Sequence, residues 1–151
     1  MTYDIIEEPC NGDYVQLITF CAARASTGLV VVSEPQALAP TALRFLQALS
    51  PFSVETKAAS EWPGTKLFGR SSWVYRFRVD IDSCELIIRA AGRLYDWVEP
   101  NLPEDLCLLR RSADPILVTI SHESDAYLQL EQGEAAELQS RFSHEIIRVR
   151  S

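Results

Sequence analysis

Residues 102–130, LPEDLCLLRRSADPILVTISHESDAYLQL, decide the fold. Three largely apolar runs lie in this stretch, CLLRR at 107–111, ILVTIS at 116–121 and AYLQL at 126–130. Serine, aspartate and proline, which favour turns, separate these runs. Short β-type runs joined by such turns are typical of neighbouring antiparallel strands. We therefore predict a three-stranded antiparallel meander.

The rest of the chain alternates helical and extended patterns. Apolar residues at three- and four-residue spacing predict helices at 14–26, 40–49, 84–98 and 133–142. β-Branched or alternating runs predict strands at 28–34, 53–60 and 73–79. For the tail at 144–151 two alternatives stay open, a further strand or a free end. The predicted class is α+β, a single domain over residues 1–151, with an antiparallel sheet and helices packed on one side.

Two details of these elements are specific predictions. In the run WVYRFRV we expect Trp73, Tyr75, Phe77 and Val79 to face a core, with the residues between them pointing away. The pair Asp82–Ser83 is expected to cap the helix that follows, and Pro100 to end it.

Length and composition favour an ordinary globular domain. The chain has 151 residues, of which 47% are hydrophobic and 23% charged, enough to bury a core without cross-links. No apolar run is long enough to span a bilayer and the N-terminus is acidic, so we expect a cytoplasmic protein. The four cysteines show no Cys-x-x-Cys spacing, which argues against zinc and against disulfides.

The negative charge is concentrated in one segment. The net charge is -7, and residues 99–137 hold nine acids against two arginines, whereas acids and bases balance elsewhere. Such a chain lacks the clustered basic residues that nucleic-acid binding requires. The asymmetry points either to a basic partner or to a solvated face.

The sequence SHESDAY raises the question of chemistry. A zinc protease motif needs a second histidine where this chain has Ala126, so we expect no metal site and no cofactor. A carboxylate acid/base site is the alternative that stays open, using Glu104 or Asp105 with His122. The structural explanation places Glu104 and Asp105 in the first turn of a short helix, where the helix dipole favours acids. It treats His122 as a strand-end residue that satisfies a backbone group.

Three stretches carry a resemblance: EWPGT at 61–65, YDWVEPNLPEDLC at 95–107 and LVTISHESDAYLQLEQGEAAEL at 117–138. They look like a group of small bacterial proteins that are similar in size and acidity to immunity proteins, which neutralise toxins in the cytoplasm. The resemblance implies a binding role and defines no catalytic residue. The matching positions are Trp62, Pro63, Gly64, Trp97, Pro100, Pro103, Glu104, Asp105, His122 and Glu123.

The leading hypothesis is a non-enzymatic, immunity-type protein that binds a toxin with a basic cleft through an acidic surface. Its expected contacts are Glu104, Asp105, Glu123, Asp125, Glu131, Glu134, His122 and an exposed Trp62. One alternative is a small hydrolase or isomerase with a carboxylate/histidine site. Another is a homo-oligomeric module, such as a homodimer, paired through the edge of WVYRFRV or IIRVR. None of these involves nucleic acid or a membrane.

Overall fold

The computed structural model describes residues 1–151 and is built on one eight-stranded sheet. Its strand order is β10-β1-β9-β8-β7-β2-β6-β3, and all neighbouring strands are antiparallel. The strands are β1 (Thr2–Ile5), β2 (Thr27–Val32), β3 (Ser53–Ala59), β6 (Ser72–Arg78), β7 (Glu104–Leu109), β8 (Pro115–Ile120), β9 (Asp125–Gln129) and β10 (Ile147–Val149). A separate hairpin is formed by β4 (Glu61–Trp62) and β5 (Thr65–Lys66). The α+β class with an antiparallel sheet is confirmed.

The predicted meander is formed by β7, β8 and β9. Leu117 of β8 lies opposite both Leu108 of β7 and Leu128 of β9. Next to β9 lies β1, which was not predicted from the sequence, and β10 pairs with β1 on its outer side. The tail is therefore a strand and forms one edge of the sheet. The other edge is β3, whereas β6 is paired on both sides. The run WVYRFRV thus offers no free edge for pairing with a second chain.

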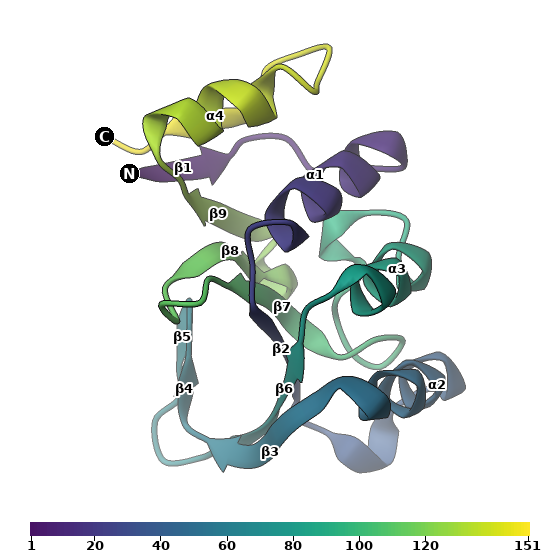
Figure 1. Ribbon diagram of the computed structural model, residues 1–151. Coiled ribbons are helices and arrows are strands. Elements are labelled where there is room, and N and C mark those ends of the chain that lie inside the picture. The colour runs from purple at the N-terminus through teal and green to yellow at the C-terminus, as the bar shows by residue number, and fades with distance from the viewer.

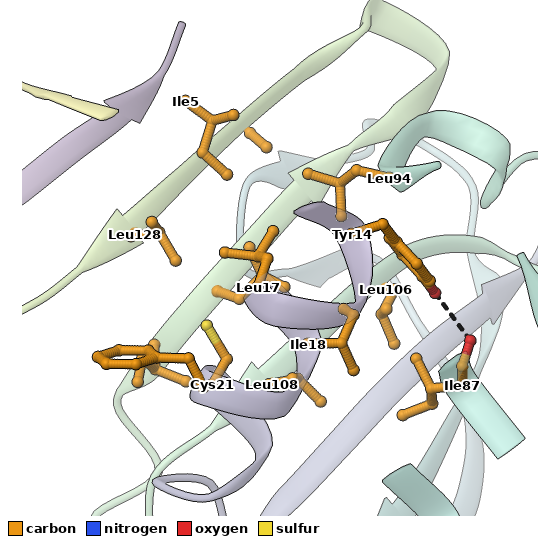
Figure 2. Packing of buried hydrophobic residues seen from close by; sticks show 14 of the residues in the cluster. Ile5, Tyr14, Leu17, Ile18, Cys21, Ile87, Leu94, Leu106, Leu108 and Leu128 are labelled. Atoms are coloured by element: carbon orange, nitrogen blue, oxygen red, sulfur yellow. Dashed lines mark hydrogen bonds between the residues drawn. The ribbon is translucent and has the colours of Figure 1, made fainter. Parts of the chain in front are cut away.

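Helices cover one face of the sheet. They are α1 (Gly12–Ala22), α2 (Pro40–Leu49), α3 (Ile81–Ala90) and α4 (Gln132–Gln139). Figure 1 shows α1, α2 and α3 on one side of β2, β6 and β3, and α4 beside β1 near both termini. Beneath α1 lies the main core, where Leu17, Ile18 and Cys21 point toward Leu106 and Leu108 of β7 (Figure 2). None of the helices has the length and apolar character needed to cross a membrane.

The opposite face of the sheet carries a second, smaller core under the β4–β5 hairpin. Along β2, Val30 faces the helices, whereas Leu29 and Val31 face the hairpin. Figure 1 shows this hairpin on the side of the sheet away from α1, α2 and α3. Both faces of the central strands are therefore buried, which explains why GLVVV reads as a continuous apolar run.

This second core changes the expected orientation of residues in β6. Phe77 faces the main core as predicted, but Val74, expected to point away from a core, is buried in the second one. Trp73, expected to be inward, has 45% of its surface exposed. The prediction was wrong for Val74 because it assumed that only one face of the strand is covered. It was also wrong for Trp73, which belongs to neither core.

The third helix is shorter than predicted. Asp80, rather than Asp82–Ser83, caps it, since the Asp80 carboxylate accepts hydrogen bonds from the backbone N–H groups of Asp82 and Ser83. The helix ends at Ala90 instead of continuing to Val98. Beyond that point the Asp96 side chain accepts hydrogen bonds from the backbone N–H of Gly92, at 3.0 Å, and of the next residue. These bonds satisfy backbone donors without a helix.

Candidate functional site

The site residues lie where β7 begins, facing the β4–β5 hairpin. Glu104 and Asp105 are the first two residues of β7, so their predicted place in a helical turn is wrong. The pairing of β7 with β2 shifts register here, because Leu29 lies opposite Cys107 but Val31 lies opposite Glu104. Asp105 has a positive φ of 55° within this irregularity. A bulge of this kind redirects a side chain, here toward the hairpin.

Asp105 is completely buried, and both of its carboxylate oxygens accept hydrogen bonds. Its Oδ2 accepts hydrogen bonds from Trp62 Nε1 at 3.2 Å and from the Thr65 hydroxyl at 3.5 Å. Its Oδ1 accepts one from the backbone N–H of Ser121 at 3.1 Å. Burial raises the pKa of the Asp105 carboxyl, and the bonds from Trp62 and Ser121 act in the opposite direction. The carboxylate thus ties the hairpin to the end of β8.

Glu104 lies half-buried beside a second carboxylate, that of Glu99. The Glu99 oxygens accept hydrogen bonds from the backbone N–H groups of Ser33 and Glu34, both at 3.0 Å. Burial, together with repulsion from Glu99 and Asp105, raises the pKa of Glu104 to about 7. The fold therefore holds several acidic groups close together at an energetic cost.

His122 completes the group. It sits in the single-turn 3-10 helix η4 (Ser121–Glu123), which follows β8. Its Nδ1 lies 3.7 Å from Asp105 Oδ1, and its Nε2 lies 3.8 Å from Glu123 Oε1. Both separations exceed hydrogen-bond length. Glu104, Asp105 and His122 each offer one ligand atom, and these three atoms lie within 4.8 Å of one another.

These residues line a cleft of about 590 Å³ between the hairpin, β7 and η4. Its charged lining consists of Glu34, Glu99, Glu104, Asp105, Arg70 and the imidazole of His122. With every carboxyl ionised and the imidazole neutral, the formal charge of the cleft is -3. An acidic hollow of this size suits a cation or a cationic side chain.

The other residues that were predicted to contact a partner lie partly in the second core and partly on the surface. Trp62 is 7% exposed and packs in the second core, so it is no exposed anchor. Glu123 and Asp125 are exposed near η4, and Glu131 is exposed just before α4. Glu134 forms an ion pair with Arg110, with 2.6 Å between Nη2 and Oε1. Asp105 is buried as well, although it lines the cleft.

Three charged residues of the cleft were not predicted from the sequence, namely Glu34, Glu99 and Arg70. They come from loops far apart in the chain, and no periodic pattern marks them. Glu99 lies within YDWVEPNLPEDLC, but its role depends on the loop after β2, which donates both of its hydrogen bonds.

Comparisons with protein-family models, with curated proteins and with solved structures give no match. The resemblance to immunity-type proteins therefore stays a prediction.

Proposed function

We propose that this chain is a binding protein whose acidic cleft receives a positively charged group of a protein partner. The observation that carries the proposal is the convergence of four carboxylates in one hollow of about 590 Å³, opposed by a single arginine. Such a cleft attracts a lysine or arginine side chain over a distance and favours it further by partial exclusion of water.

The partner class that fits best is a toxin with a basic functional surface, which makes the chain an immunity-type protein. Covering that surface would block access of nucleic acid or nucleotides to it. The exposed acids near η4, Glu123 and Asp125, extend the negative field beyond the cleft. Glu134 contributes less to this field because its charge is neutralised by Arg110 and Arg24.

The test is co-expression with the product of the neighbouring reading frame. Growth rescue and co-elution on a sizing column are the two readouts. In the Glu34→Gln/Glu104→Gln double variant, rescue should be lost and affinity should fall by about tenfold or more. The matched control is Asp82→Asn/Glu85→Gln, which makes two acid-to-amide changes in α3 on the helical face. Equal behaviour of the two double variants would show that the cleft is not the binding site.

A second candidate is a small hydrolase or isomerase that uses Glu104 or Asp105 with His122. Convergence of the three groups within 4.8 Å favours it, because acid/base catalysis requires this proximity. The direct test is turnover of chromogenic ester and phosphoester substrates by the purified wild-type chain and by His122→Ala. Equal rates for the two proteins would rule out catalysis through this histidine for these substrates.

A further inference from the structure

Two of the cleft's polar groups face each other without a hydrogen bond between them. The distance of 3.7 Å from His122 Nδ1 to Asp105 Oδ1 is too long for a hydrogen bond and leaves little room for a water molecule. In a tetrahedral zinc site, ligand atoms that each lie about 2.1 Å from the ion are about 3.4 Å from one another. The observed separation is close to that value.

We propose that Glu104, Asp105 and His122 bind one Zn²⁺ ion at the inner end of the cleft. Two carboxylates and one imidazole form a donor set that suits this ion, and all three donor atoms lie within 4.8 Å. Closing the longer separations requires a small movement of one side chain. His122 is free to make it, because 46% of its side chain is exposed.

The surroundings of Asp105 support a ligand role. Trp62 and Thr65 hold Oδ2, and the Ser121 backbone N–H is the single hydrogen-bond donor to Oδ1. Oδ1 therefore keeps a free lone pair on the side of His122. Hydrogen bonds of this kind orient a metal-ligating carboxylate before the ion arrives, which reduces the cost of ordering it.

The cleft leaves the fourth coordination position open. Three protein ligands with one position for water or another ligand is the arrangement of reactive zinc sites, whereas structural sites have four protein ligands. The ion would change the formal charge of the cleft from -3 to -1, so it would weaken binding of a cationic partner. The zinc site rests on the chain's own geometry, and its test needs no partner.

The experiment is calorimetric titration of ZnCl₂ into the full chain after removal of metal with a chelator, with MgCl₂ as the contrasting salt. We expect one Zn²⁺ per chain and much weaker binding of Mg²⁺, which prefers octahedral oxygen ligands. His122→Ala and Glu104→Gln should each weaken Zn²⁺ binding by about tenfold or more, since loss of a ligand removes a coordinate bond. Circular dichroism verifies that both variants are folded.

The matched control is His144→Ala, which removes the other histidine and leaves the cleft intact. His144 Nε2 lies 3.3 Å from Glu7 Oε2, so this variant also tests the one other histidine–carboxylate pair outside the cleft. Both histidine variants keep all four thiols, so zinc bound by cysteine would affect them equally. The proposal is overturned by absence of Zn²⁺ binding, or by binding that is the same in His122→Ala and His144→Ala.

Discussion

Trp62→Phe tests the contact on which the cleft depends. The substitution keeps an aromatic ring in the second core but removes the N–H that donates to Asp105 Oδ2 at 3.2 Å. A hydrogen bond to a charged, buried acceptor contributes about 1.5–3 kcal/mol. The Thr65 hydroxyl, at 3.5 Å, is too distant to replace it. The smaller ring adds a packing loss on the order of 1 kcal/mol. We therefore expect the free energy of unfolding to fall by about 3 kcal/mol.

Urea denaturation followed by far-ultraviolet circular dichroism measures this change without relying on tryptophan fluorescence. In a chain of this length, the expected loss lowers Tm by roughly 6–12 °C. The effect should be smaller at pH 4 than at pH 7. The hydrogen bond from Trp62 favours the ionised carboxylate and so acts to lower the pKa of Asp105. Protonation of Asp105 at low pH therefore weakens the stabilisation that this hydrogen bond provides.

The control is Trp73→Phe on β6. Trp73 is 45% exposed and its indole makes no hydrogen bond, so this change should cost about 0.5 kcal/mol or less. If Trp62→Phe and Trp73→Phe destabilise the protein equally, the Trp62–Asp105 bond does not hold the hairpin on the sheet. The geometry of the cleft would then depend on some other contact.

Three further predictions concern local structure. Gly64→Ala should lower the free energy of unfolding by about 1–3 kcal/mol, because the φ of Gly64 is +87° and the new methyl group would meet side chains of β8. Gly12→Ala is the control: a methyl group there would enter open space, so the change should be neutral or stabilising. Thermal denaturation of both variants measures the difference. Asp80→Ala should cost about 1 kcal/mol in urea titration through loss of the α3 cap, and Asp82→Ala should cost less. Folding raises the pKa of Glu104 from 4.5 to about 7. The stability that this group contributes is therefore complete below pH 4.5 and is lost as the pH rises through 7. In Glu104→Gln, the free energy of unfolding should depend less on pH between 5 and 8.

Much of the sheet was predictable because its information is local. The meander shows apolar runs separated by turn residues, and α2 begins at Pro40, as its sequence predicts. β1 and β10 carry no such local information. Each has four residues or fewer, and each becomes a strand only by pairing with a distant part of the chain. Local sequence carries no signal of such pairing.

The sequence predicted which residues form the site but not how they are arranged. Glu104, Asp105 and His122 were selected from the sequence, and the structure brings them together. The helical turn predicted for Glu104 and Asp105 was wrong, because the two residues begin β7 and the bulge between β2 and β7 decides where Asp105 points. His122 follows the end of β8, as predicted. The burial of Trp62 also depends on the β4–β5 hairpin folding over the sheet, which a turn sequence alone does not show.

The structural role of Asp105 is enough to explain its position. Its carboxylate joins the hairpin, through Trp62, to the backbone after β8. That role requires neither Glu104 nor His122. Burial and two acidic neighbours oppose the charge of Glu104. Substitution of Glu104 or His122 should therefore leave the hairpin in place while it weakens the Zn²⁺ binding proposed above. Substitution of Asp105 should both weaken Zn²⁺ binding and destabilise the hairpin, and this difference separates the proposed binding from the cleft's contribution to stability.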